Sequence, residues 1–444
     1  MEADHAHRNA EPIEDGIPRL GAERGGSLVS AGVDVLVVGA GLAGLECARR
    51  MAESGASVVL ADRKPTVDHA VHTTGIFVRR TLESFDLPDD CLGPAVRRVE
   101  LYSPRGRSMV LESAHDEYRV GRMGPLYLRG LDACIRAGVR WAPSTGLATL
   151  EPDAAGSIAI LERGVRRERL PARFVVGADG AMSRVAAALG LDENREWIVG
   201  VEEVFRGVST GHVPAFHCWI DPEVAPGYIA WVVDDGEEVH VGVGGYASRF
   251  QPAEALRRFQ ARVARRFGLE GATPCERRGG RIPVGGVLPR IACARGLLTG
   301  DAAGAVSPLT AGGLDPCLRL SALAAEVTTE FLATGDERAL ASYDGGALRA
   351  RFRTRLLIRR ALSAVRSPLA AELACAALRL PPFHAVARHV FFGRGSFPDV
   401  ARAGDDHARA GAESRPLPGS LPVNRASPTF STHPRPHRTP ASTP

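Results

Sequence analysis

Residues 33–44 read VDVLVVGAGLAG, an apolar run that leads into three glycines spaced as Gly-x-Gly-x-x-Gly. The β-branched run predicts a buried strand, and residues 42–54 that follow have the periodicity of a helix. A second apolar run at 57–61 predicts the next strand, so the segment is typical of a strand–helix–strand unit that begins a parallel sheet. We therefore predict an α/β fold that starts with a Rossmann-like domain, a parallel sheet covered by helices.

The glycine loop indicates a dinucleotide-binding site. Gly39 permits the tight turn, Gly41 lets a pyrophosphate approach the backbone, and Gly44 allows close packing of helix on strand. The helix N-terminus offers free N–H groups to the phosphates. Asp62 follows the second strand, where an acid binds a ribose and disfavours a 2′-phosphate, which predicts FAD or NAD rather than NADP. The contacts predicted here are Gly39, Ala40, Gly41, Leu42, Ala43, Gly44, Asp62 and Arg63.

The composition excludes several other classes of protein. The formal net charge of +4 is mild for 444 residues, and no basic run with interleaved aromatics occurs, so we expect no nucleic-acid partner. The eight cysteines form no CxxC pair, which argues against a zinc or iron–sulfur site. No apolar stretch of about 18 residues predicts a membrane-spanning helix, and no signal peptide is evident. We expect a cytoplasmic protein.

Composition and hydrophobic pattern divide the chain into segments. Residues 1–32 form a charged, Gly-rich leader, and residues 404–444 are dominated by Pro, Ser, Thr, Arg and His, so we predict disorder at both ends. Residues 216–246 alternate apolar and polar side chains between turn signals, which predicts an antiparallel sheet. The predicted domains are a discontinuous FAD-binding domain (33–95, 119–196 and 289–345), an inserted antiparallel-sheet substrate-binding domain (96–118 and 197–288) and a C-terminal helical segment (346–403).

Two further glycine-rich loops follow predicted strands. The first reads GADGAMSRVAAALG at 177–190, and the second reads GDAAGAVSPLTAGG at 300–313. Asp301 could hold a hydroxyl-rich chain, and the helix that begins after Gly313 could direct its N-terminus at an electron-rich ring edge.

The three loops in this order resemble those of the FAD-dependent oxidoreductases of the p-hydroxybenzoate hydroxylase-like superfamily, over residues 33–345. GDAAGAVSPLTAGGLDP is similar to the pattern GDAAGxxNPxTGEGI of the geranylgeranyl reductase branch, and APGYIAWVV (225–233) resembles the Pro-x-x-Tyr-x-Trp-type motif at that branch's substrate cavity. Three positions depart from the reductase pattern: Ser307, Ala311 and Gly312 replace Asn, Gly and Glu. The cysteine-containing loop of that branch is here VDHAVHTTGIFVRR (67–80), with no cysteine.

The resemblance implies roles for residues along the whole cofactor. Asp301 would hold the ribityl chain, Pro308 would lie along the flavin, and Gly312 and Gly313 would face its pyrimidine edge. The further residues expected to bind FAD are Arg122, Asp179, Gly180, Gly300, Ala302 and Leu314. Tyr228 and Trp231 would line the substrate pocket or serve as ordinary sheet-core aromatics. His72 is the acid–base candidate, with a structural role as the alternative, and Thr74 in the same loop is a candidate catalytic pocket residue.

Three functions are compatible with this pattern. The first is reduction of a carbon–carbon double bond in an isoprenoid or other lipophilic substrate, with NAD(P)H or a ferredoxin-type protein as electron donor. The second is hydroxylation of an aromatic or polyketide-like substrate by a flavin monooxygenase, although hydroxylases of this superfamily commonly carry His where Gly304 stands. The third is a flavin electron carrier. The arginine-rich segment 351–366 is either a solvated helix face or a peripheral membrane contact on the cytoplasmic side.

Overall fold

The computed structural model describes residues 32–208 and 210–393. The predicted tail, residues 394–403 of the predicted C-terminal segment, and all of the predicted leader except residue 32 lie outside the described residues. Within the described part, no helix is long and apolar enough to cross a membrane.

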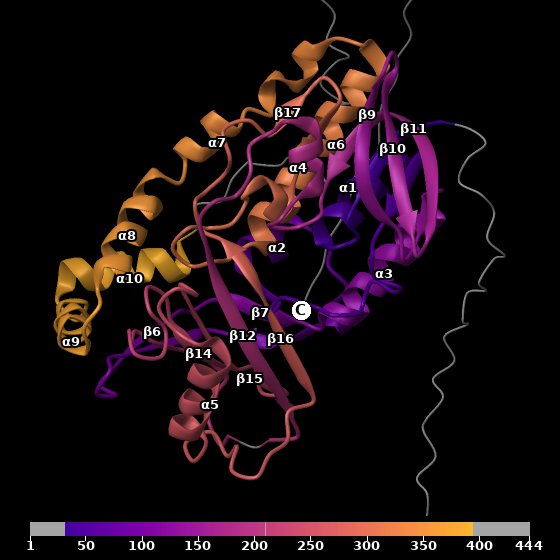
Figure 1. Cartoon of the computed structure of the whole chain (residues 1–444). Coiled ribbons are helices and arrows are strands. Elements are labelled where there is room, and N and C mark those ends of the chain that lie inside the picture. Colours follow the sequence, from indigo (N-terminus) through magenta and orange to yellow (C-terminus); the bar gives the residue numbers. More distant parts are fainter. Residues whose placement is uncertain (1–31, 209, 394–444) are drawn as a thin grey trace, which may run out of the picture. The chain divides into compact units, whose positions relative to one another are not determined.

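A mainly parallel sheet forms the first layer, as predicted (Figure 1). Its central strand β1 (Val33–Val38) pairs in parallel with β2 (Val58–Ala61) on one side and with β11 (Arg166–Gly177) on the other. The remaining strands of this sheet are β8 (Arg140–Ala142), β9 (Gly146–Asp153), β10 (Gly156–Arg163), β17 (Ala292–Cys293) and β18 (Gly296–Leu298). β8 and β18 extend the parallel part, whereas β9, β10 and β17 join it by antiparallel pairing. The α/β prediction is confirmed.

Helices cover this sheet because its strands are apolar on both faces. Consecutive residues Val35, Leu36 and Val37 of β1 are fully buried, which only a sheet covered on both sides allows. The helices associated with this sheet are α1 (Leu42–Glu53), α3 (Met123–Arg136), α4 (Arg184–Leu189) and α6 (Leu314–Thr334). They contribute to one hydrophobic core with the strands.

The second layer is a seven-stranded sheet in the order β16-β12-β15-β14-β13-β5-β6. Its strands are β5 (Arg98–Tyr102), β6 (Ser108–Glu112), β12 (Trp197–Arg206), β13 (Ala215–Trp219), β14 (Ala230–Asp234), β15 (Glu238–Gly245) and β16 (Glu276–Pro283). All neighbours are antiparallel except β13 and β5, which run parallel. The predicted antiparallel sheet is present, with one parallel pair where the segment 96–118 returns to it.

The two faces of this sheet have different chemistry because side chains alternate along each strand. On one face Val239, Val241 and Val243 of β15 pack against Leu256 and Phe259 of α5 (Pro252–Val263). The opposite face carries His240, Gly242 and Gly244, which alternate with those valines.

Smaller elements connect the two layers. A three-stranded antiparallel sheet consists of β3 (Ile76–Val78), β4 (Leu92–Val96) and β7 (Tyr118–Gly121). The short helices are α2 (Arg79–Ser84), η1 (Asp89–Cys91), η2 (Gly300–Ala303) and η3 (Glu337–Ser342), followed by α7 (Gly345–Ala350), α8 (Arg353–Ala364), α9 (Pro368–Ala377) and α10 (Pro381–Phe392). Pro368 and Pro381 stand at the first position of α9 and α10, where proline suits a helix start.

Candidate functional site

The first glycine loop joins β1 to α1, and its three glycines meet different surroundings. A Cβ on Gly39 would lie 2.3 Å from the carbonyl oxygen of Ala178, and one on Gly44 would lie 1.7 Å from the carbonyl oxygen of Gly39. A Cβ on Gly41 would meet nothing within 4 Å. Packing therefore requires Gly39 and Gly44, whereas Gly41 faces open space at the N-terminus of α1, where no side chain caps the helix.

Asp62 fixes this loop from the end of β2. One carboxylate oxygen accepts a hydrogen bond from the Ala40 amide at 2.7 Å, and the other accepts one from the Lys64 amide at 2.8 Å. The carboxylate thus lies beside the loop, as the sequence predicts for a ribose-binding acid. The neighbouring Arg63 packs its side chain on Gly146.

The loop at 300–313 lies against the first loop although about 260 residues separate them in sequence. A Cβ on Gly300 would lie 2.9 Å from the Cβ of Ala43 in the first turn of α1, and Gly300 has a φ of +57°. Asp301 follows it, and no described residue donates a hydrogen bond to its carboxylate. Removal from water raises the pKa of Asp301 to about 6. The three glycine-rich loops form one continuous surface, because Ala178 of the middle loop also contacts Gly39.

The end of this third loop presents the N-terminus of α6. Gly313 caps the helix without a side-chain hydrogen bond, so the first amides of α6, from Leu314 onward, keep their donors for another partner. Ala311 before it has a φ of +52°, in the region that favours glycine. Pro308 is buried in the same loop, and the Tyr228 hydroxyl donates to the Thr310 carbonyl at 2.6 Å. This hydrogen bond ties the loop to the seven-stranded sheet.

These features fit FAD. Open space at Gly41 and the uncapped start of α1 suit a pyrophosphate, and Asp62 suits a ribose. The unpartnered carboxylate of Asp301 suits a ribityl hydroxyl, and the free amides at the start of α6 suit the electron-rich edge of a flavin.

Two predicted cofactor contacts use their side chains elsewhere. The carboxylate of Asp179 accepts hydrogen bonds from the Ser183 hydroxyl and from the Arg184 and Val185 amides at the start of α4. Burial raises its pKa. Next to it, Gly180 (φ +84°) faces open space. Gly180 therefore leaves room for a ligand beside this loop.

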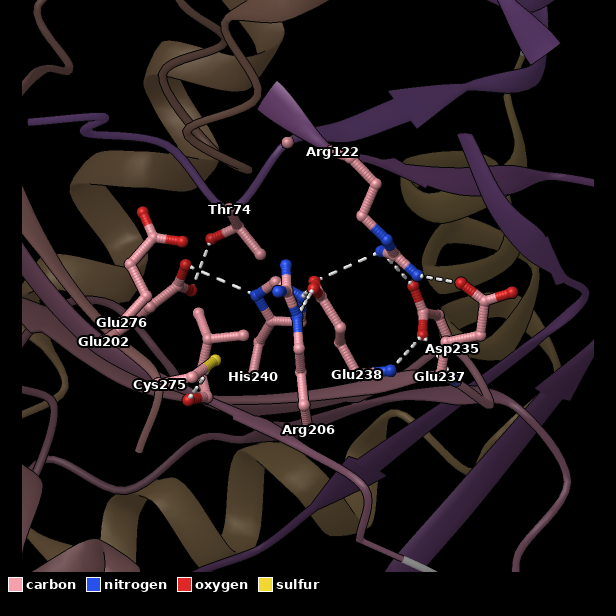
Figure 2. Close-up of polar contacts among 12 residues, drawn as sticks. Thr74, Arg122, Glu202, Arg206, Asp235, Glu237, Glu238, His240, Cys275 and Glu276 are labelled. Carbon is pink, nitrogen blue, oxygen red and sulfur yellow. Dashed lines mark hydrogen bonds and ion pairs between the residues drawn. The ribbon is translucent and has the colours of Figure 1, made fainter. Parts of the chain in front are cut away.

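Arg122 lies against carboxylates of the second sheet. Its guanidinium is 2.8 Å from Asp235, 2.6 Å from Glu237 and 3.2 Å from Glu238 (Figure 2). Despite the opposing effect of desolvation, hydrogen bonds to Asp235 and Glu237 raise the pKa of Arg122. Its role at the flavin stays a prediction, and in this structure it joins the start of α3 to the carboxylates beside the seven-stranded sheet.

Glycines shape the face of the seven-stranded sheet opposite α5. In the strand register, Glu202 of β12 pairs with Gly242 of β15, which pairs with Trp231 of β14. A Cβ on Gly242 would lie 2.2 Å from the indole, so the ring crosses β15 over this glycine. Its Nε1 then donates to Glu202 Oε2 at 3.0 Å. Tyr228 lies similarly over Gly244, where a Cβ would be 2.7 Å from the phenol ring.

Glu202 is the centre of a buried polar network that sequence patterns alone did not indicate (Figure 2). It accepts a hydrogen bond from the Thr74 hydroxyl at 2.7 Å, and the Arg278 guanidinium lies 3.5 Å away. His240 lies between two carboxylates, with Nδ1 3.5 Å from Glu202 and Nε2 3.2 Å from Glu238. Arg122 then contacts Glu238, so alternating charges link Thr74 to the carboxylates around Arg122.

The charges in this network hold a proton on His240. Burial alone would lower the pKa of His240, but Glu202 and Glu238 outweigh it and raise this pKa to about 9. Burial would raise the pKa of Glu202, yet His240, Thr74 and Arg278 lower it overall. At neutral pH the network therefore contains an imidazolium between two carboxylates.

Of the predicted catalytic residues, three share this face. Thr74 and Trp231 both hydrogen-bond Glu202, and the ring centroids of Tyr228 and Trp231 lie 6.4 Å apart. His72 is exposed and packs on Gly280 of β16, where a Cβ would lie 3.6 Å from its own Cβ. It does not join the polar network.

Gly304 has a structural explanation. It ends η2 with a φ of +68°, and a Cβ there would lie 2.6 Å from the Gly286 carbonyl oxygen and 3.0 Å from Asn194 Oδ1. The backbone and its neighbours exclude a side chain, so the lack of histidine at this position does not by itself distinguish reduction from hydroxylation.

Known proteins resemble this chain over most of its length. The model of the lycopene cyclase protein family matches residues 34–366. The digeranylgeranylglycerophospholipid reductase of Methanothrix thermoacetophila is 30% identical over 320 residues, which cover 68% of this chain and 79% of that relative. Digeranylgeranylglycerophospholipid reductase 1 of Methanopyrus kandleri is 33% identical over 317 residues, which cover 69% of this chain and 83% of that relative.

Solved structures share the fold. A geranylgeranyl bacteriochlorophyll reductase-like protein from Thermoplasma acidophilum superposes with a TM-score of 0.71 at 19% identity, over 82% of this chain and 97% of that one. The p-nitrophenol 4-monooxygenase from Pseudomonas putida superposes with a TM-score of 0.61 at 18% identity, over 82% and 99%. The fold described above, with its parallel and antiparallel sheets, thus also occurs in solved proteins.

Proposed function

The chain belongs to the lycopene cyclase protein family and to that of the archaeal reductases with which it aligns, and we propose that it is an FAD-dependent oxidoreductase that saturates a carbon–carbon double bond of an isoprenoid lipid. One observation carries this proposal. The loop that would hold the flavin is tied by Tyr228 to a sheet face on which Trp231 lies flat over glycine. An aromatic, glycine-lined face beside a flavin suits a long apolar chain.

The cofactor would be held by the helix starts and the aspartates of the first and third glycine loops. The start of α1 at Gly41 would bind the pyrophosphate, Asp62 the adenosine ribose, and Asp301 the ribityl chain. The amides at Gly313 and Leu314 would face the flavin ring, where the α6 N-terminus favours negative charge. Reduced FAD would supply the hydride, and the organic chemistry of that step belongs to the cofactor.

The protein must supply the proton that completes the saturation. One carbon of the double bond takes the hydride and the other takes a proton, so the product gains two hydrogens. We propose that His240 stores this proton and that Glu202 links it to the hydroxyl of Thr74, which belongs to the loop at 67–80. Glu202→Gln should lower kcat by about 100-fold with FAD content unchanged. An unchanged kcat would remove the network from the reaction.

The electron donor belongs to the proposal as well. NAD(P)H and a reduced ferredoxin-type protein are the two candidates, and each leaves a different signature. Anaerobic mixing of the FAD-loaded protein with NADH, NADPH or reduced ferredoxin, followed by the bleaching of the flavin band, identifies the donor directly.

The lipophilic substrate also favours a contact with a membrane surface. In α8, Arg355 and Arg359 point inward, so the segment 351–366 is not a uniformly solvated face. Exposed apolar side chains lie instead on α9 and α10: Leu369, Leu373, Leu380, Phe383 and Val386. We propose that these helices contact lipid. Co-flotation with anionic vesicles tests this, and recovery of the protein only in the lipid-free fractions would contradict it.

Hydroxylation is the second candidate, because packing accounts for Gly304 and the fold also carries monooxygenases. The deciding experiment reduces the FAD-loaded protein without oxygen and supplies an unsaturated isoprenoid lipid. Saturation of the alkene under these conditions supports the reductase. Turnover that needs oxygen and yields a hydroxylated product supports the monooxygenase.

A further inference from the structure

Arg359 of α8 is buried without a counter-charge. Its side chain is 1% exposed, and all three guanidinium nitrogens are buried and have no hydrogen-bond partner among the described residues. The group stacks between two aromatic rings, 5.1 Å from the centroid of Tyr246 and 5.6 Å from that of Tyr228. Ring stacking compensates only part of the cost of burying a charge, so the site is suited to an anion.

A second buried arginine shows what a satisfied group looks like in this protein. Arg319 of α6 is also 1% exposed, but its guanidinium donates to Asp315 at 2.9 Å and to the Ser84 hydroxyl at 2.9 Å. Arg359 has no such carboxylate or hydroxyl. The contrast separates an arginine satisfied by the protein from one whose donors have no partner among the described residues.

Arg355 adds a second positive charge on the same side of α8. It stands one helical turn before Arg359, and its Nη1 donates to the Ser307 hydroxyl at 3.2 Å in the loop that would hold the flavin. Neither arginine has a carboxylate within ion-pair distance among the described residues. The helix therefore presents two cationic groups between the flavin loop and the aromatic residues of the sheet.

The position of Arg359 relates it to the predicted substrate residues. Tyr228 contacts Arg359 and also packs with Trp231. Beyond Trp231 lies Glu202, at the polar network. The contacts thus lead from a cationic group through two aromatic rings to the polar network. A lipid with an anionic end and an apolar chain requires a cationic group followed by apolar surface.

We propose that Arg359, with Arg355, binds a phosphate or diphosphate ester at one end of the isoprenoid substrate. The guanidinium offers its donors to phosphate oxygens in a planar, bidentate arrangement, which a lysine does not provide. The aromatic rings of Tyr228 and Trp231 then bind the first part of the chain. This inference rests on the proposed function for the identity of the chain, and it assigns the end at which that substrate is held.

Binding to the oxidised, FAD-loaded protein tests the site without any turnover. The probes are an isoprenoid diphosphate, the isoprenoid alcohol with the same chain, and inorganic pyrophosphate. Isothermal titration should show the diphosphate bound roughly 100-fold more weakly by Arg359→Gln than by the wild type, with the alcohol nearly unaffected. Arg359→Lys should recover only part of the loss, and Arg360→Gln, at the exposed neighbour, should bind like the wild type.

Each alternative result overturns the assignment. Equal losses for diphosphate and alcohol would make Arg359 a structural residue, and unchanged diphosphate binding would remove it from the site. Pyrophosphate that binds as tightly as the isoprenoid diphosphate would show a site for free phosphates instead of a lipid. If the binding pattern holds but no alkene is saturated, the site stands and the proposed reaction fails.

Discussion

At the scale of single residues, backbone conformation and a few side chains decide the site. Gly41 differs from Gly39 and Gly44 in what a Cβ would meet, and that difference marks it as the one of the three with room for a ligand. Ala311 illustrates the opposite case, since it occupies a left-handed conformation (φ +52°) that a glycine adopts without cost. The resembling reductase pattern has glycine there, which this conformation favours, and nothing in the structure explains the alanine of this chain.

Ala311→Gly should stabilise the protein. Relief of the left-handed strain is worth about 1 kcal/mol, part of which the greater freedom of the unfolded chain removes. The urea midpoint of the FAD-loaded protein should therefore rise. Ala305→Gly is the control, because Ala305 is buried without a positive φ and its replacement should lower the midpoint. A lower midpoint for Ala311→Gly would show that the methyl group packs favourably there.

Two buried histidines should make the free energy of unfolding depend on pH in opposite directions. Glu202 and Glu238 overcome burial to raise the pKa of His240 to about 9, whereas burial lowers the pKa of His217 to about 4. The contribution of His240 is thus fully present below about pH 6.5 and is lost as the pH rises to 9. The contribution of His217, which is neutral in the folded protein, is lost as the pH falls below about 6.5.

Thermal melts across this pH range measure both effects. At pH 6 the His240→Gln protein should melt at a lower temperature than the wild type. The corresponding loss of unfolding free energy should be on the order of 3 kcal/mol at pH 6 and should shrink toward pH 9. The groups facing His240 are Glu202, Glu238, Arg278 and Arg122, and none of them should titrate in this window. In His217→Gln the loss of stability below pH 6.5 should be reduced. A difference for His240→Gln that does not vary with pH would mean that His240 is neutral in the folded protein.

At the scale of elements, the strand register brings together what the sequence separates. The dinucleotide loop and the antiparallel strands at 216–246 were predictable, because each depends on residues that are near one another in the sequence. The network of Glu202, His240 and Arg278 was not, since it requires β12, β15 and β16 to pair in one particular register. The available signal was the alternation of Gly242 and Gly244 with valines in β15, which leaves one face without side chains.

Gly242 tests this register. Gly242→Val would place a side chain where the indole of Trp231 crosses β15, and overpacking of this kind costs about 1–3 kcal/mol. Trp231 should move off Glu202, with a shifted tryptophan emission and an increase in KM larger than the fall in kcat. Gly285→Ala is the control, because a Cβ there has ordinary contact distances. Unchanged emission and KM in Gly242→Val would contradict the position of the indole.

At the scale of the whole molecule, two glycine loops far apart in sequence become one site. The contact between Gly300 and Ala43 exists only once α1 and α6 are assembled with the parallel sheet, so the shared site could be inferred from resemblance but not from either loop alone. The same assembly places Asp301 near the start of α6, where its carboxylate has no partner among the described residues.

Substitutions at two aspartates should distinguish an effect on cofactor binding from an effect on folding stability. Asp301→Asn should weaken FAD binding by roughly 10- to 100-fold, because a charge-assisted hydrogen bond to the ribityl chain is lost. Asp179→Asn should lower the melting temperature, because α4 loses carboxylate acceptors, and leave the FAD content of folded protein unchanged. Equal FAD loss in both variants would contradict the separate roles.

The central claim is that bound FAD faces an isoprenoid chain and saturates it. The most direct test is a single-turnover experiment under nitrogen, in which the FAD-loaded protein is reduced, mixed with an unsaturated isoprenoid lipid and analysed by mass spectrometry. The account predicts flavin reoxidation and a product heavier by two hydrogens, with no oxygen consumed. A flavin that stays reduced until oxygen is admitted, together with a product that has gained an oxygen atom, would contradict it.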